Sequence, residues 1–214
     1  MKPLLFLLLI LFFIVPSVIL FWLPLGQRNT RTPDHPTEKN SDKRDAFFFR
    51  LQKKASAAKQ FVLQNRLSTH CVFLLDMQLP SGRKRFFVYN LDKDSVLATG
   101  LVAHGSCNNR FLETAAFSNK PGCGCSAAGR YKVGAAYSGR LGKAFKLHGL
   151  DNSNSNAYQR NIVLHAYSCV PDDECYPYPI CNSLGCAMVS CKFLTLLDRF
   201  IEKEKKPLLL WIYE

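Results

Sequence analysis

The pattern of apolar and polar positions changes abruptly near residue 26. Residues 4–25 form an almost unbroken apolar run, interrupted only at Pro16, Ser17 and Pro24. At about 1.5 Å per helical residue this run spans roughly 33 Å, which is enough to cross the hydrocarbon core of a bilayer. A cleaved signal peptide usually has a shorter apolar core and a small-residue cleavage site, and residues 22–25 offer no such site. We therefore predict a retained membrane helix over residues 1–26, with a cleaved signal peptide as the alternative.

Apolar residues next recur with a helical period. Residues 27–44 are polar and contain Pro33 and Pro36, so they predict a flexible linker. Residues 45–70 then predict an amphipathic helix from Asp45, a candidate cap, to Arg66. Its apolar positions fall at three- and four-residue spacing, and we expect this stripe to pack on the following domain: Phe48, Leu51, Ala55, Ala58 and Val62.

From Cys71 onward the period shortens and glycine becomes frequent. Pro80–Arg83 predicts a hairpin turn between two strands, and residues 138–142 predict a second turn. Residues 192–205 predict a helix that ends before Pro207. The predicted strands are residues 72–77, 84–90, 95–104, 130–137, 143–150, 161–166 and 208–213. Residues 71–214 thus predict one mainly β domain with a few helices, large enough for a hydrophobic core.

Cysteine content bears on the compartment. The chain has nine cysteines, which is unusual for a small domain in a reducing cytosol, and an odd number suits disulfides plus one free thiol. We therefore expect the domain to lie in the cell envelope, on the extracytoplasmic side of the cytoplasmic membrane, or to be secreted. The other eight cysteines would allow four bridges. Cys169 with Cys175 is one candidate pair, whereas Cys123 and Cys125 are too close together to pair easily with each other.

The net charge of +12 is unevenly distributed. Residues 27–70 hold ten Lys or Arg against four Asp or Glu. This basic segment either contacts anionic headgroups or forms a solvated linker and helix face. Nucleic acid is not an expected partner, because the chain carries an export signal and no recognisable nucleic-acid-binding module. The sequence does not define an oligomeric state.

One pair of motifs contains the parts of an activated thiol. The apolar run of residues 162–164 ends in His165, and Ser183-Leu184-Gly185-Cys186 presents a cysteine after a glycine. A thiol becomes an effective nucleophile when an adjacent imidazole takes its proton, and glycine permits a sharp backbone turn beside the sulfur.

These motifs, with residues 146–151 and 160–165, resemble the L,D-transpeptidase catalytic domain of the YkuD type, in particular its murein-transpeptidase branch. Further matching segments are residues 87–91, 100–105, 129–134 and 210–214. The resemblance covers about residues 71–214. It implies an L,D-transpeptidase-like β-sandwich or barrel and an acyltransferase that acts on peptidoglycan stem peptides without a cofactor. The apolar run at residues 4–25 adds the expectation that this enzyme is anchored in the membrane.

The resemblance also implies roles for individual residues. Cys186 would attack the carbonyl between a diamino acid and the terminal D-alanine of a tetrapeptide stem, forming a thioester that a neighbouring amine resolves into a crosslink. His165 would be the base and then the acid, and backbone N–H groups of residues 184–186 would hold the oxyanion. Ser183 and Gly185 complete the catalytic set, and His148, Gly149 and Arg160 are the substrate-binding candidates, with Arg160 suited to a stem carboxylate.

Several alternatives stay open at this point. His148 is a second candidate base, and Ser183 either orients the site or closes a turn. Cys186 itself is either the nucleophile or half of a disulfide with Cys181 or Cys191. A zinc site is not expected, since the cysteine spacings match no tetrahedral pattern.

The activity also has alternatives. An L,D-carboxypeptidase would share the thioester and resolve it with water, and a non-catalytic wall-binding scaffold would keep Cys186 in a bridge. The chain departs from the commoner family pattern at Leu184, where histidine is usual, and at Ala187 and Met188, where Arg or Asn soon follows the cysteine. Side-chain contacts from those positions to the substrate are therefore not carried over.

Overall fold

The computed structural model describes residues 36–214, with side chains from residue 45 onward. The chain separates into two units, Met1–Asp42 and Lys43–Glu214, and the second contains the sheet. The predicted membrane segment 1–26 and the first part of the predicted linker lie outside the described residues. Within residues 36–214, no helix combines the length and apolarity needed to cross a membrane.

The first described element is the helix α2, Pro36–Gln64. It begins inside the segment predicted as linker, before Asp45, so residues 36–44 are helical. Proline is well tolerated in the first turn of a helix because its missing N–H would have no partner there. Asp45 is therefore an interior helical residue and not a cap.

A single eight-stranded sheet forms the body of the domain, in the order β3-β2-β1-β8-β4-β5-β6-β7. Its strands are β1 (Cys71–Asp76), β2 (Phe86–Asn90), β3 (Ser95–Gly100), β4 (Gly129–Gly139), β5 (Gly142–Gly149), β6 (Val163–Ala166), β7 (Ala187–Val189) and β8 (Leu209–Tyr213). Within residues 36–214 the other elements are the helix α3 (Cys191–Lys203) and the short η1 (Asn152–Asn154). The mainly β fold with helices is confirmed.

The two predicted turns join antiparallel strands. Residues 80–83 lie between β1 and β2, and Gly139 pairs with Gly142 at the tip of the β4–β5 hairpin. An isolated bridge between Ala103 and Met188 connects the segment after β3 to β7, so the two ends of the sheet are linked. The arrangement therefore resembles a barrel more than a two-sheet sandwich.

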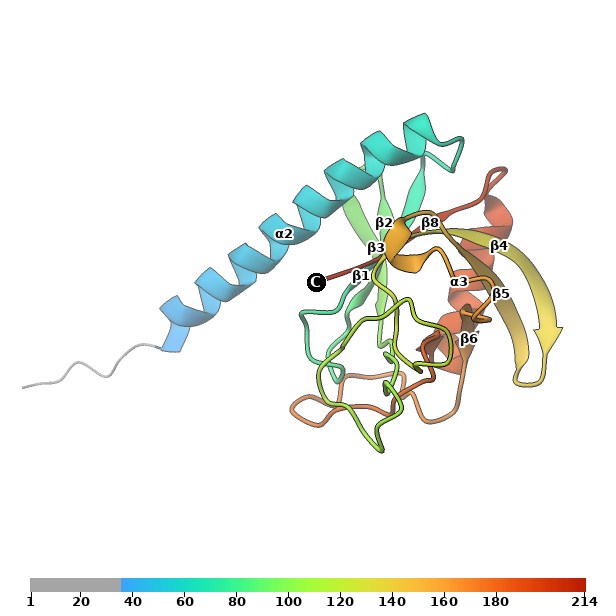
Figure 1. Cartoon of the computed structure of the whole chain (residues 1–214). Coiled ribbons are helices and arrows are strands. Elements are labelled where there is room, and N and C mark those ends of the chain that lie inside the picture. The colour runs from blue at the N-terminus through green and yellow to red at the C-terminus, as the bar shows by residue number, and fades with distance from the viewer. Residues whose placement is uncertain (1–35) are drawn as a thin grey trace, which may run out of the picture. The chain divides into compact units, whose positions relative to one another are not determined.

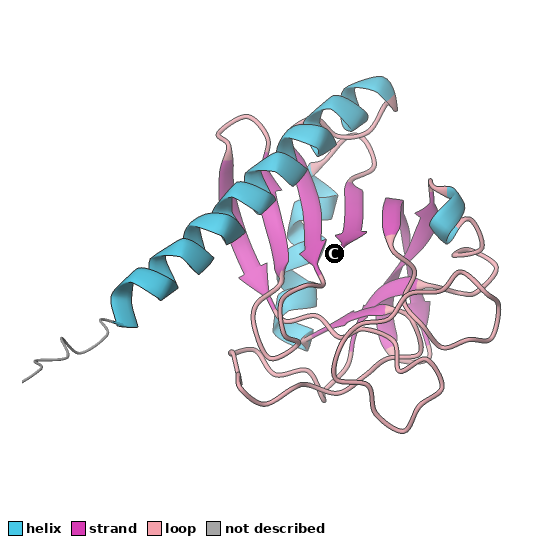
Figure 2. Cartoon of the chain, turned by 60° about the vertical axis from the view of Figure 1, so that its left-hand side comes forward, coloured by secondary structure: helices cyan, strands magenta, loops and turns pink. Residues whose placement is uncertain are grey.

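The two main helices cover opposite faces of the sheet (Figures 1 and 2). The predicted stripe of α2 is buried against β1, β2 and β8, except Phe48, which is 51% exposed. On the other face, Phe193, Leu194 and Leu197 of α3 enter the larger core cluster. The central strand β1 is buried along its whole length for this reason.

The sequence did not predict β7, the strand that follows Cys186. It has three residues, pairs in parallel with β6, and is buried. A segment this short carries no measurable periodicity, so only its pairing with β6 defines it as a strand.

Candidate active site

Two neighbouring parallel strands position His165 and Cys186. His165 is the third residue of β6 and lies opposite Met188 in β7, while Leu164 lies opposite Ala187. One step back in this register places Cys186, immediately before β7, beside Val163. Val163 and His165 share one face of β6, because side chains alternate along a strand. The register therefore brings Cys186 and His165 to the same face.

These two residues line one cleft of about 350 Å³. Its lining comes from β5, β6, the turn before β7 and the tip of the β4–β5 hairpin. The lining residues are Tyr137, Gly139, Arg140, Leu141, Gly142, Ala144, Asn161, Val163, His165 and Cys186. Within residues 45–214 no hydrogen bond joins the Cys186 thiol to the His165 ring. The thiol instead points toward the Asn161 carbonyl, with Sγ and O 3.8 Å apart.

Burial and hydrogen bonding set the protonation of both groups. Burial raises the pKa of the Cys186 thiol, and this effect is opposed by the Val163 N–H and by the charges of Arg160 and Lys146. Burial lowers the pKa of His165. Its Nδ1 lies 3.1 Å from the Ala166 carbonyl oxygen, which only accepts, so Nδ1 carries the proton and Nε2 is the unprotonated nitrogen.

Ser183 closes the turn that carries the cysteine. Its hydroxyl donates to the Cys186 carbonyl at 2.8 Å and accepts from the Gly185 N–H at 3.1 Å. Ser183 N–H also donates to the His104 carbonyl at 2.8 Å. Both hydroxyl contacts lie within the turn, so the structure supports the turn-closing role of Ser183.

Gly185 has a backbone conformation that favours glycine, with φ +112°. A Cβ at this position would lie 2.6 Å from the Cys125 carbonyl oxygen and 3.0 Å from Cδ1 of Ile162. Both the dihedral angle and the close approach of a neighbouring loop therefore require glycine before the cysteine.

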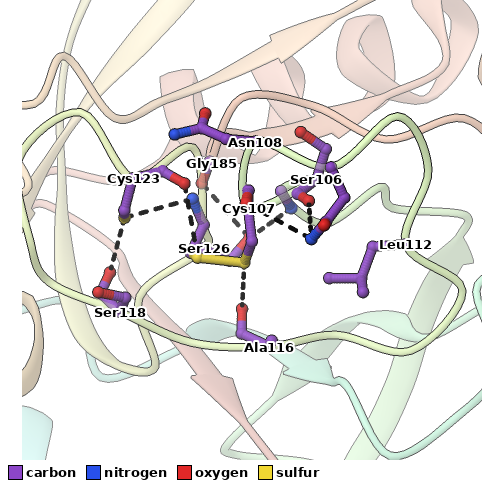
Figure 3. Close-up of a disulfide and its surroundings, with 12 residues drawn as sticks. Ser106, Cys107, Asn108, Leu112, Ala116, Ser118, Cys123, Ser126 and Gly185 are labelled. Atoms are coloured by element: carbon purple, nitrogen blue, oxygen red, sulfur yellow. Dashed lines mark hydrogen bonds between the residues drawn. A yellow bond between two sulfur atoms is a disulfide. The ribbon is translucent and has the colours of Figure 1, made fainter.

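The neighbouring loop contains the disulfide between Cys107 and Cys125. Figure 3 shows Ser126 beside this disulfide and next to Gly185. The Ser126 hydroxyl accepts from Gly105 N–H at 3.0 Å and donates to the Gly185 carbonyl at 3.4 Å. The disulfide loop thus supports the turn that presents Cys186.

The guanidinium of Arg160 donates hydrogen bonds to this same loop. Its guanidinium donates to the Ser118 carbonyl at 2.7 Å, to the Cys125 carbonyl at 2.5 Å and to the Cys123 sulfur at 3.3 Å. These donors are the ones that a bidentate carboxylate contact would use. The geometry gives Arg160 a positioning role close to Cys186.

His148 and Gly149 lie away from the cleft. His148 is on β5, four residues from Ala144, which lies opposite His165, so it is displaced by about 13 Å along the strand. Its ring stacks on Tyr158 with centroids 5.1 Å apart. A Cβ on Gly149 would lie 2.0 Å from the Asn154 carbonyl oxygen, so this glycine permits close packing against η1. Of the two candidate bases, only His165 shares the cleft with Cys186.

The nine cysteines form two disulfides and not four. Cys169 pairs with Cys181, so the suggested pair of Cys169 with Cys175 is wrong, and Cys107 pairs with Cys125. The free cysteines are Cys71, Cys123, Cys175, Cys186 and Cys191. Cys71 is unpaired because β1 carries it into the core, where burial raises its pKa to about 12. Cys186 is not bridged to Cys181 or Cys191, contrary to what the scaffold alternative requires.

Two residues that line the cleft, Tyr137 and Asn161, were missed from sequence, as was Lys146, which contacts both. The Lys146 ammonium donates to the Asn161 side-chain oxygen at 3.2 Å and lies over the Tyr137 ring, 5.1 Å from its centroid. The alternation of β5 contained a signal, because Phe145 and Leu147 face the core and Lys146 must face the other way. In the part of the chain that the structure describes, no group of three or more His, Cys, Asp or Glu side chains is arranged to hold a metal ion.

Residues 42–213 match the family model of the L,D-transpeptidase catalytic domain. The match covers most of the chain, and the chain therefore belongs to this family. The family resemblance in the sequence is confirmed. No curated protein matches the chain.

Solved structures give weaker likenesses. The helical cell shape determining protein Pgp2 from Campylobacter jejuni aligns with a TM-score of 0.44 and 14% identity, covering 68% of this chain and 48% of that one. A mutant form of Pgp2 gives the same score and identity. An L,D-transpeptidase from Xylanimonas cellulosilytica aligns with a TM-score of 0.40 and 14% identity, covering 72% of this chain and 68% of that one. The chain spans about half the length of the Pgp2 structures that it matches.

Proposed function

We propose that the domain is a peptidoglycan L,D-transpeptidase that uses Cys186 as its nucleophile and His165 as its general base. The observation that carries this proposal is that the two residues line one cleft from adjacent strands. The Nε2 of His165 is free to accept a proton, since Nδ1–H is held by Ala166. Family membership supplies the substrate class, the peptide stems of the cell wall.

The acylation step follows from these positions. His165 Nε2 takes the thiol proton while Sγ of Cys186 attacks the carbonyl carbon between the diamino acid and the terminal D-alanine. The C–N bond breaks, the proton passes from His165 to the leaving D-alanine amine, and a thioester remains. Because burial raises the thiol pKa, proton transfer to the imidazole is what makes the sulfur nucleophilic near neutral pH.

The turn before β7 supplies the donors for the developing oxyanion. Gly185 N–H is held by the Ser183 hydroxyl, which leaves the N–H groups of Leu184 and Cys186 for this role. Leu184 is 77% exposed, so its side chain stands in solvent where the commoner family pattern has a histidine.

The second step determines the product. The amine of a neighbouring stem attacks the thioester carbon, the C–S bond breaks, and the released thiolate recovers a proton through His165. In a transpeptidase the product is a crosslink. If water takes the place of the amine, the same thioester gives a shortened stem and the enzyme is an L,D-carboxypeptidase.

The testing experiment is intact-mass analysis of the protein after incubation with a tetrapeptide stem. The wild type should gain the mass of the stem minus D-alanine, located at Cys186 by peptide mapping. Cys186→Ala should gain none, and His165→Gln should slow acylation by at least 10²-fold. Equal adduct formation by the wild type and Cys186→Ala would overturn the mechanism. Analysis of the released products for crosslinked or shortened stems identifies the acceptor.

The localisation that fits this substrate is the cell envelope. We propose an extracytoplasmic domain tethered through residues 1–26, as the apolar run of the sequence predicts. Protease digestion of the tagged chain in intact cells and in spheroplasts tests this localisation. An extracytoplasmic domain is digested in spheroplasts, where the outer layers of the envelope are open, whereas a cytoplasmic domain stays protected.

A further inference from the structure

Lys146 lies in the same cross-strand row as the candidate nucleophile. It pairs with Val163 across β5 and β6, and the β6–β7 register places Cys186 beside Val163 on the far side. Adjacent strands are about 4.8 Å apart, so the Cα atoms of Lys146 and Cys186 are separated by about 10 Å. The lysine side chain is long enough for its ammonium to reach the space above the thiol.

The ammonium is held in place without being neutralised. It donates to the Asn161 side-chain oxygen at 3.2 Å and lies 5.1 Å and 5.4 Å from the ring centroids of Tyr137 and Tyr158. Such aromatic neighbours attract a cation and still leave its charge uncompensated.

Within residues 45–214, no Asp or Glu oxygen lies within 4.0 Å of the Lys146 ammonium. By contrast, carboxylates lie within that distance of Arg50, Arg130 and Lys143. Lys146 is thus an oriented cation beside the cleft with no acidic partner from the described chain.

An unpaired, oriented cation at this distance from a nucleophile suits an anionic group of the substrate. We propose that Lys146 binds a carboxylate of the donor stem that flanks the scissile amide. This inference rests on the proposed function. Two carboxylates fit the chemistry: that of the terminal D-alanine, which lies about 4 Å from the scissile carbon, and the side-chain carboxylate of the diamino acid, where the stem carries one.

Lys146 takes over the role that the sequence suggested for Arg160. The guanidinium of Arg160 is used by two backbone carbonyls and a sulfur, whereas the Lys146 ammonium has one neutral oxygen and two aromatic faces as partners. A further charged residue, Arg140, is exposed at the tip of the β4–β5 hairpin. Among residues 45–214 its guanidinium has no hydrogen-bond or ion-pair partner that would fix it toward the cysteine.

The test measures stem binding in a Cys186→Ala background, where no thiol is present and Lys146 cannot act through thiol ionisation. Isothermal titration compares this protein with the same protein carrying Lys146→Met, Lys146→Arg or Lys132→Met. Lys132 lies on β4 and lines a different hollow, beside His148, so it is the matched charge-removal control. Each protein is titrated with a tetrapeptide stem, with the same stem ending in D-alaninamide, and with the stem amidated on the diamino acid.

We expect Lys146→Met to weaken binding of the unmodified stem about tenfold, and Lys146→Arg to restore most of the loss. Lys132→Met should leave binding unchanged. Amidation of one of the two carboxylates should weaken binding to the parent protein by a similar factor and cause no further loss with Lys146→Met, which identifies the carboxylate that is bound.

Equal affinities of the parent and Lys146→Met, an equal loss on all three stems, or no stem binding at all would overturn the proposal. Thermal unfolding of each variant verifies that the domain is folded. The acylation experiment on the wild type tests the proposed function separately. Stem binding that depends on Lys146, without a thioester in the wild type, would reject the catalytic mechanism and keep this inference.

Discussion

Arg160 donates a hydrogen bond of 2.5 Å to the carbonyl oxygen of Cys125, and Cys125 is disulfide-bonded to Cys107. The same carbonyl is the nearest atom to the position where Gly185 would carry a Cβ. One peptide unit is therefore in contact with the arginine, the disulfide and the turn that holds the candidate nucleophile. The geometry of Cys186 consequently depends on a loop more than fifty residues away in sequence.

Replacement of Arg160 distinguishes a positioning role from substrate binding. We expect Arg160→Met to slow acylation at saturating stem about tenfold or more, with little change in the half-saturating stem concentration, because the loop beside Gly185 loses its charged donor. The free energy of unfolding should fall by about 2 kcal/mol. Single-turnover mass spectrometry and urea unfolding measure the two effects. A variant that acylates at the wild-type maximal rate but needs far more stem would show direct substrate binding by Arg160.

The disulfide between Cys107 and Cys125 should stabilise the domain through this loop. Its sequence separation is 18 residues, for which chain entropy predicts about 3 kcal/mol of stabilisation. The double variant Cys107→Ser/Cys125→Ser should lose about that amount in urea unfolding and should acylate more slowly. Cys191→Ser, which removes a free and exposed thiol, is the control and should change neither quantity. Unaltered acylation by the double variant would show that the loop does not support the cysteine turn.

Gly185→Ala tests whether the turn before Cys186 requires glycine. The added Cβ would meet the Cys125 carbonyl oxygen at 2.6 Å in a backbone with φ +112°. We expect the free energy of unfolding to fall by about 2–3 kcal/mol and acylation to fall at least 10²-fold. Gly122→Ala is the matched control, since Gly122 has φ +73° but no atom within 4 Å of the added Cβ. Gly122→Ala should lose about 1 kcal/mol of unfolding free energy and keep its acylation rate. Similar losses of stability and of acylation rate in both variants would show that backbone strain alone explains the effect.

The sequence predicted most of the fold because alternation and turn residues are local signals. Most strands, α3 and the buried stripe of α2 follow from such patterns. The start of α2 was missed because Pro33 and Pro36 suggested a linker, although a proline in the first turn does not prevent a helix.

The candidate site was predictable only in part. His165 and Cys186 lie in recognisable motifs, and the structure places both in one cleft. Strand alternation predicts only that Lys146 faces away from the core. Its place in one row with Cys186 depends on strand register, and the contacts of Arg160 depend on loop packing, which the sequence pattern does not reveal. His148 was an attractive candidate from its sequence neighbours, but the strand direction carries it away from the cleft.

His104 provides a test of acid stability that is independent of catalysis. It is fully buried, its Nδ1 lies 2.8 Å from Nη2 of Arg85, and its Nε2 lies 3.0 Å from the Leu112 carbonyl oxygen. Arginine only donates and a carbonyl only accepts, so the ring is neutral with the proton on Nε2. Burial and the Arg85 charge lower the pKa of His104 to about 4.

The lowered pKa of His104 makes the folded domain less stable at acid pH. The unfolded chain protonates His104 below about pH 6.5 and the folded domain does so only near pH 4, so the free energy of unfolding should fall as the pH drops between these values. The complete loss of unfolding free energy from this one group is about 3 kcal/mol. His104→Gln keeps an acceptor for Arg85 and a donor for Leu112 but has no titrating group. The free energy of unfolding of this variant should therefore lack the fall that His104 causes between pH 6.5 and pH 4. Urea unfolding of both proteins from pH 7 to pH 4 measures it, and parallel profiles for the wild type and His104→Gln would contradict the assignment of a neutral His104.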